Sequence, residues 1–153
     1  MMLDQVYPNL NHVGVVVENI SKAGKDDSHR FGLGNIVGRN TLHVEDALYR
    51  GKKVSFSAEF GFIDLGNTSI ELIQPIGTGP SPYFDALHEK GESTHHLAFV
   101  VSSIDEHLKI AGSVPPAPRI ILDARLHRGV GRFVYIEGLV HGVLIELIEF
   151  FKN

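Results

Sequence analysis

The sequence contains no cysteine, so disulfides, thiolate metal sites and a cysteine nucleophile are all excluded. No run of lysine and arginine exceeds two residues and the formal net charge is −4, which argues against nucleic acid as a partner. No apolar run approaches the roughly 20 residues of a membrane-spanning helix, and the first residues lack the basic and apolar regions of a signal peptide. We therefore expect a cytoplasmic protein that does not enter a membrane.

The chain is long enough to bury a hydrophobic core as a single domain covering residues 1–153. Apolar residues make up 43% and charged residues 21% of the sequence, which is ordinary for a globular protein.

Two apolar segments, each opening on a histidine, divide the chain into similar halves. Asn-His-Val-Gly-Val-Val-Val at 11–17 resembles His-His-Leu-Ala-Phe-Val-Val at 95–101. His12 and His96 are 84 positions apart, and the same spacing separates Ile20 from Ile104. This repetition predicts two copies of one structural unit.

A second matched pair of segments closes each half with a glutamate. Ser-Ile-Glu-Leu-Ile at 69–73 resembles Leu-Ile-Glu-Leu-Ile at 144–148. Strand alternation places Glu71 and Glu146 on the face opposite their apolar neighbours. A lone glutamate of this kind usually lies at an exposed edge, and a lone histidine is usually a satisfied polar residue. Because each half contains both a histidine and a glutamate of this kind, the pattern favours a shared role for the four residues.

The pattern of apolar residues predicts an α+β fold of two tandem βαβββ modules. We expect module 1 over about 9–75, a linker over about 76–93 and module 2 over about 94–150. The expected strands are 9–17, 35–45, 54–62, 69–74, 94–102, 119–125, 131–137 and 142–150. The expected helices are about 22–31, with Ser21 as N-cap, then 82–90, with Gly91 as C-cap, and 105–111. Residues 46–52 are expected to form a loop.

Burying a carboxylate costs several kcal/mol unless it is paired or bound to a cation. If a pseudo-twofold axis relates the modules, His12, Glu71, His96 and Glu146 converge on one point. Two imidazoles and two carboxylates suit a divalent metal ion, and these ligand types do not separate Co, Ni, Zn, Mn and Fe. We expect His95 to point away from this centre and to serve in packing.

Several stretches resemble the vicinal oxygen chelate (glyoxalase/bleomycin resistance/dioxygenase) superfamily, and within it methylmalonyl-CoA epimerase. The resemblance lies in His-Val-Gly-Val-Val-Val at 12–17, Gly-Asn-Thr-Ser-Ile-Glu-Leu-Ile-Gln-Pro at 66–75, Gly-Glu-Ser-Thr-His-His-Leu-Ala-Phe at 91–99 and Gly-Val-Leu-Ile-Glu-Leu at 142–147. It implies a curved mixed sheet around a metal cleft, with His12, Glu71, His96 and Glu146 as metal ligands. Because the repeats pair Glu71 with Glu146, we assign the catalytic base to Glu146 and the opposing acid or base to Glu71.

One position departs from the epimerase pattern. The second catalytic glutamate of those enzymes lies on the third strand, where a straight count places Phe60. Glu59, one residue away, then points to the opposite face unless a bulge shifts the register.

The resemblance implies a metal-dependent isomerase, epimerase or lyase that removes a proton next to a carbonyl of an acyl-CoA or 2-oxo compound. The alternatives are a glyoxalase I-like lactoylglutathione lyase and a metal-free small-molecule-binding protein of the antibiotic-resistance type. An extradiol dioxygenase would need one carboxylate fewer. We also expect a homodimer, because pairing of subunits covers exposed sheet edges.

Overall fold

The computed structural model describes residues 9–25, 32–140 and 142–152, which contain eight strands, three helices and one 3₁₀ turn. The first half contains β1 (His12–Val16), α1 (Ile20–Ala23), β2 (Ile36–Tyr49), β3 (Lys52–Asp64) and β4 (Ser69–Ile76). Next come α2 (Pro82–Lys90), β5 (Ser93–Val100), α3 (Ile104–Gly112), β6 (Ile120–Arg125), the 3₁₀ turn His127–Gly129, β7 (Gly131–Val140) and β8 (Val143–Phe150). The described helices are too short to span a membrane.

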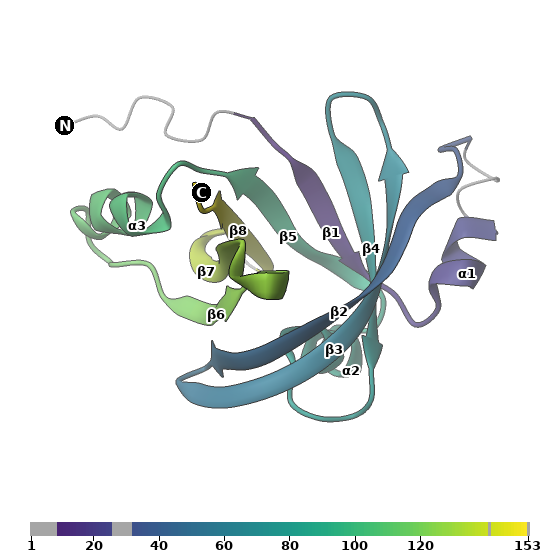
Figure 1. Ribbon diagram of the computed structural model, residues 1–153, viewed down its shortest axis with the longest axis horizontal. Helices are drawn as coiled ribbons and strands as arrows, with labels where there is room; N and C mark the ends of the chain where they lie inside the picture. Colours follow the sequence, from purple (N-terminus) through teal and green to yellow (C-terminus); the bar gives the residue numbers. More distant parts are fainter. Residues whose placement is uncertain (1–8, 26–31, 141, 153) are drawn as a thin grey trace.

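The strands form a closed, mixed ring in the order β1-β4-β3-β2-β6-β7-β8-β5. Within each half the opening strand runs parallel to the closing strand, as β1 does to β4 and β5 to β8. The halves meet through the antiparallel pair β1 and β5, which lie side by side in Figure 1. On the far side the ring closes where β2 pairs with β6 through Leu48↔Asp123 and Tyr49↔Leu122. The fold is thus the curved α+β sheet that the sequence predicted.

The inside of the ring holds the largest hydrophobic cluster, to which both halves and α2 contribute. Val16, Val44, Tyr83, Leu122 and Tyr135 are buried in it. Tyr83 comes from α2, and its hydroxyl lies 2.6 Å from that of Tyr135. Burial of this apolar surface is the main term holding the two halves together.

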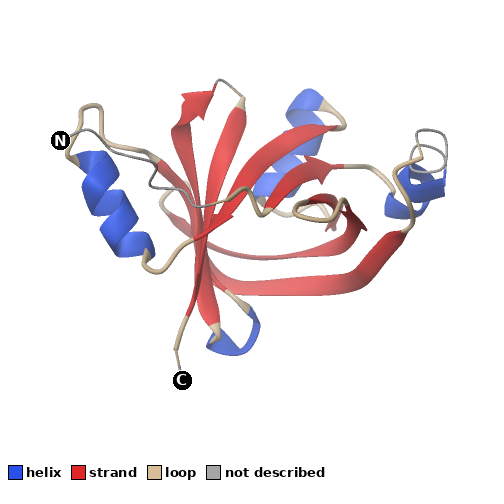
Figure 2. Cartoon of the chain, turned by 90° about the horizontal axis from the view of Figure 1, so that it is seen from above, coloured by secondary structure: helices blue, strands red, loops and turns tan. Residues whose placement is uncertain are grey.

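Two smaller clusters lie on the outer face, one under each of the matched helices. Ile20 begins α1 and packs with Val17, Ile63 and Leu72. Ile104 begins α3 and packs with Val101, Val134 and Leu147. Both isoleucines are fully buried, so their 84-residue spacing reflects one packing arrangement used twice. The two helices lie on opposite outer sides of the strands (Figure 1), and Figure 2 shows this from above.

The predicted start of the first helix was wrong by two residues. α1 begins at Ile20, and its N-cap is Asn19, whose side chain accepts a hydrogen bond of 2.8 Å from the Lys22 amide. Asn19 competes with Ser21 for this role, and burial of Ile20 fixes the earlier start. Residues 26–31 of the predicted helix lie outside the described residues.

The predicted loop over 46–52 was also wrong, because β2 continues to Tyr49 and β3 begins at Lys52. Only Arg50 and Gly51 separate them, with φ of 50° and 79°. Two consecutive positive φ values are typical of the tight turns that follow the natural twist of a hairpin. The helix over 82–90 is confirmed, with Ser81 as N-cap and Gly91 as C-cap.

Leu122 and Leu48 lie on the two strands that close the ring, and they provide a matched test of its interior. Leu122 is fully buried and Leu48 is 51% exposed. We predict that Leu122→Ala lowers the free energy of unfolding by about 2–5 kcal/mol because it leaves a cavity. Leu48→Ala should change it by only about 0.5 kcal/mol. Urea denaturation of both variants measures the difference, and equal losses would contradict the packing described.

Candidate metal centre

The two strands that join the halves carry the two histidines. In the β1–β5 pair, Gly14 lies opposite His96. A Cβ atom at Gly14 would come within 2.1 Å of the His96 ring. The imidazole therefore occupies the space that any other residue at position 14 would fill, and it reaches toward His12. His12 and His96 are both buried.

The closing strand of each half brings its glutamate to the same place. Glu71 on β4 pairs with Gly14, and Glu146 on β8 pairs with Ala98. Gly14 and Ala98 each stand two residues after their half's histidine, so the two pairings are equivalent.

The four predicted side chains are brought together by this arrangement. The Nε2 atoms of His12 and His96 are 3.1 Å apart. Glu146 Oε2 lies 3.2 Å from His12 Nε2 and 3.0 Å from His96 Nε2. Glu71 Oε2 lies 3.5 Å from His12 Nε2, and Glu71 Oε1 lies 3.7 Å from His96 Nε2. The contacts His12–Glu71 and His96–Glu146 lie within one module each. The other three contacts join the two modules.

The chemistry of this quartet fits a divalent cation. Atoms that share one metal at about 2.1 Å lie about 3.0–3.4 Å from each other, which is close to most of the observed separations. His12, Glu71 and His96 offer ligand atoms that all lie within 4.8 Å of one another. Glu146 Oε2 is buried without a hydrogen-bond partner, although it is near both imidazoles. An orphaned carboxylate oxygen is costly in a protein interior, and a cation would satisfy it.

The two carboxylates differ electrostatically. Burial raises the pKa of Glu71 by more than the imidazoles of His12 and His96 lower it. Burial acts on Glu146 in the same direction, but His96 and His12 outweigh it and lower the pKa of Glu146 to about 2. Burial opposes protonation of His12, yet Glu146 and Glu71 together raise its pKa. Glu146 is thus the carboxylate that stays ionised, and Glu71 is the one that more readily holds a proton.

The expectation that His95 points away from the centre was wrong. Gly14 pairs with His96 while Val15 pairs with Thr94, so His95 is an extra residue in a β-bulge. The bulge turns His95 inward, where it packs edge-on against Tyr83 and Tyr135. Burial lowers the pKa of His95 to about 3, which keeps the ring neutral. The strict alternation assumed from the sequence fails at this position.

Glu59 lies on the outer face, as the straight count predicted. It accepts a hydrogen bond of 3.1 Å from Arg39 Nε, and the same guanidinium donates to Ser21 of α1. Phe60 instead packs against the interior cluster. The inner face of β3 therefore provides no carboxylate at this position.

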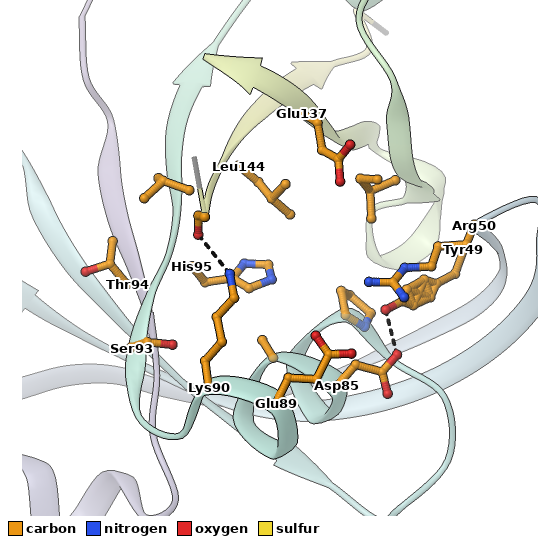
Figure 3. Close-up of a pocket in the computed structure, with 15 residues that line it drawn as sticks. Tyr49, Arg50, Asp85, Glu89, Lys90, Ser93, Thr94, His95, Glu137 and Leu144 are labelled. Carbon is orange, nitrogen blue, oxygen red and sulfur yellow. Dashed lines mark hydrogen bonds between the residues drawn. The ribbon is translucent and has the colours of Figure 1, made fainter. Parts of the chain in front are cut away.

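The structure also has a pocket of about 530 Å³, which the sequence did not reveal. Its walls come from α2, the end of β2 with the turn that follows, the starts of β5 and β8, and one residue each of β6 and β7 (Figure 3). His95 lines it, but none of His12, Glu71, His96 and Glu146 does. Arg50, Lys90 and Glu137 are among its charged lining residues. The pocket thus lies on the other side of His95 from the histidine–glutamate quartet.

The chain forms a ring of two repeated modules with histidines and glutamates inside it. Comparison with known proteins identifies the class that has this arrangement. The family model of the glyoxalase/bleomycin resistance protein/dioxygenase superfamily matches residues 11–111, about two thirds of the chain. The chain belongs to this superfamily, as its sequence resemblance implied.

The chain is 32% identical over 100 residues to the uncharacterized protein YqjC of Bacillus subtilis (strain 168). That match spans 65% of this chain and 62%, less than two thirds, of the relative.

Solved structures share the fold at low sequence identity. The hypothetical protein BH1468 from Bacillus halodurans C-125 has a TM-score of 0.64 at 22% identity, covering 95% of this chain and 96% of its own. Methylmalonyl-CoA epimerase from Mycobacterium tuberculosis has a TM-score of 0.64 at 21% identity, covering 99% and 94%. A Streptomyces coelicolor methylmalonyl-CoA epimerase variant in complex with 2-nitronate-propionyl-CoA also has a TM-score of 0.64, at 18% identity, covering 95% and 99%.

Gly14 provides a direct test of the geometry. We predict that Gly14→Ala displaces the His96 ring, since the new methyl group would overlap it. The variant should lose at least about tenfold in affinity for Co²⁺ or Zn²⁺ through misplacement of one donor. Gly112→Ala is the control, because nothing lies within 4 Å of a Cβ at that position. Isothermal titration calorimetry of the two variants measures the difference; unchanged affinity in Gly14→Ala would contradict the placement of His96.

Proposed function

We propose that the protein is a metal-dependent isomerase or lyase that removes a proton from a carbon next to a carbonyl. The observation that carries this proposal is the quartet itself: two imidazoles and two carboxylates, one of each from either module, with each carboxylate 3.0–3.7 Å from the Nε2 atoms of both imidazoles. Membership of the superfamily and the shared fold of the epimerases support it.

His12, Glu71, His96 and Glu146 would hold the divalent cation, which Co, Ni, Zn, Mn and Fe all suit. When bound, such a cation stabilises the negative charge that develops on substrate oxygens as the proton leaves. The same four side chains orient the substrate indirectly, because they fix where the cation sits. The barrel interior around them is apolar, which keeps competing water away.

The proton steps belong to the two glutamates. Glu146, held ionised by the imidazoles, accepts the proton from the carbon next to the carbonyl, and the C–H electron pair passes into the carbonyl as an enolate. Glu71 is the opposing acid or base and returns a proton to the carbon; the equivalent places of Glu71 and Glu146 in the two modules support this pairing.

The substrate class we propose is an acyl-CoA, as in the methylmalonyl-CoA epimerase structures, or a 2-oxo compound. One observation favours the second candidate, a glyoxalase I-like lactoylglutathione lyase. The interior face of β3 carries Phe60, and Glu59 is engaged by Arg39 on the outer face. This chain therefore relies on the quartet alone for its acid and base. A metal-free binding protein of the antibiotic-resistance type would leave the buried Glu146 oxygen unpaired.

We also propose that the protein works as a cytoplasmic homodimer. Among the described residues, β2 pairs with β6 only through Leu48 and Tyr49. No strand that the structure describes pairs with the rest of that edge of β2, and a second subunit would cover it.

The proton transfer is tested by Glu146→Gln, which keeps the shape of the side chain but cannot accept the proton. We expect hydrogen–deuterium exchange at the substrate carbon to fall by a factor of about 10²–10⁴. NMR with methylmalonyl-CoA and with the methylglyoxal–glutathione hemithioacetal measures it and separates the two substrate classes. Glu59→Gln is the matched control and should exchange at the wild-type rate. Unchanged exchange in Glu146→Gln would show that Glu146 is not the base. Full activity of the metal-free wild-type protein would show that the reaction does not need the cation.

A further inference from the structure

Each of the two buried histidines is held by the side chain immediately before it. His12 Nδ1 lies 2.8 Å from Asn11 Oδ1. His96 Nδ1 lies 2.8 Å from His95 Nδ1. Asn11 and His95 are 84 positions apart, as are His12 and His96. The two modules therefore repeat the support of each imidazole as well as the imidazole itself, although the supporting residue types differ.

A consecutive residue in a regular strand would point away from its neighbour, so each support needs a special backbone. His95 reaches His96 because the bulge in β5 turns both rings to the inside. Asn11 precedes β1, outside the regular strand. The backbone N–H of Asn11 donates to Ala98 O at 2.8 Å, and the backbone carbonyl of Asn11 accepts from Thr68 Oγ1 at 3.2 Å. Both backbones are thus fixed where the support is made.

The distribution of protons follows from the atoms that meet. The amide oxygen of Asn11 only accepts, so His12 must carry its proton on Nδ1 to bond with it. Two imidazole nitrogens at 2.8 Å share one proton, so either His96 or His95 donates. His96 Nε2 lies in the quartet, 3.1 Å from His12 Nε2 and 3.0 Å from Glu146 Oε2. When the lone pair of His96 is on Nε2, its ring proton is on Nδ1, and Nδ1 donates to His95 Nδ1. His95 then carries its own proton on Nε2.

We propose that Asn11 and His95 are a matched pair of positioning residues. They hold His12 and His96 in the tautomer with the proton on Nδ1 and the Nε2 lone pair directed into the quartet. A histidine ligand depends on a partner of this kind for its orientation and basicity. The proposal rests on the proposed function, since it assigns Nε2 of both rings to the divalent cation. Asn11 acts through His12, and His95 acts through His96.

The supports can be removed and exchanged one at a time. We expect His95→Leu and Asn11→Ala each to weaken Zn²⁺ binding by about 10–100-fold. His95→Asn places in the second module the amide that the first module uses, and it should bring the affinity back to within a few-fold of wild type. Isothermal titration calorimetry with Zn²⁺ alone measures all three. Tyr83→Phe breaks the hydroxyl contact beside His95, and Asn40→Ala removes an exposed asparagine; both should bind Zn²⁺ as wild type does.

A second measurement needs neither the variants nor bound metal. Two-dimensional ¹H–¹⁵N spectra of the imidazoles report which ring nitrogen carries the proton. In the wild-type protein His12 and His96 should be protonated on Nδ1, and His95 on Nε2 only. His95 protonated on Nδ1 would overturn its role as acceptor.

The outcomes separate the two proposals. Wild-type Zn²⁺ affinity in both His95→Leu and Asn11→Ala would overturn the positioning roles while leaving the metal centre in place. A loss in His95→Leu that His95→Asn does not restore would show that only the packing of His95 matters, and would also overturn its role. A wild-type protein that binds no Zn²⁺, Co²⁺ or Ni²⁺ would instead overturn the proposed function.

Discussion

The main constraint on the structure is that histidine nitrogens and glutamate oxygens lie close together in the apolar interior of the strand ring. The Nε2 atoms of His12 and His96 each lie 3.0–3.7 Å from an oxygen of both carboxylates, and Glu146 Oε2 is buried without a hydrogen-bond partner. Such an arrangement is unfavourable without a positive charge at its centre. The ring tolerates it because extensive apolar packing inside and outside the strands supplies the stability that the centre does not.

Duplication of one unit explains how the crowding is achieved. Each half contributes a histidine from its opening strand and a glutamate from its parallel closing strand, and β1–β5 pairing brings the halves face to face. Gly14 and Ala98 occupy equivalent places in the two modules, and the absence of a side chain at Gly14 makes room for the ring of His96. The outer face repeats the plan with Ile20 and Ile104. The symmetry therefore covers the core, the centre and the supports of the two histidines.

Much of this could be predicted from the sequence because it depends on period and repetition. The alternating strands, the matched helices and the convergence of His12, Glu71, His96 and Glu146 follow from local patterns and one pseudo-twofold relation. The bulge at His95 could not be predicted, because a single inserted residue leaves no mark on an apolar run. The turn at Arg50 and Gly51 was mistaken for a longer loop, since positive φ at an arginine has no reliable sequence signal. The metal-binding and catalytic roles of the quartet stay predictions.

The joint between β2 and β6 has a consequence for motion. It consists of two residue pairs, Leu48↔Asp123 and Tyr49↔Leu122, and a hydrogen bond of 2.9 Å from Arg50 N to Ile121 O beside them, whereas each other neighbouring pair of strands is joined along a longer register. Local opening of a fold begins where the fewest backbone bonds must be broken. Among the described residues, separating β2 from β6 therefore breaks fewer strand pairings than separating any other two neighbouring strands.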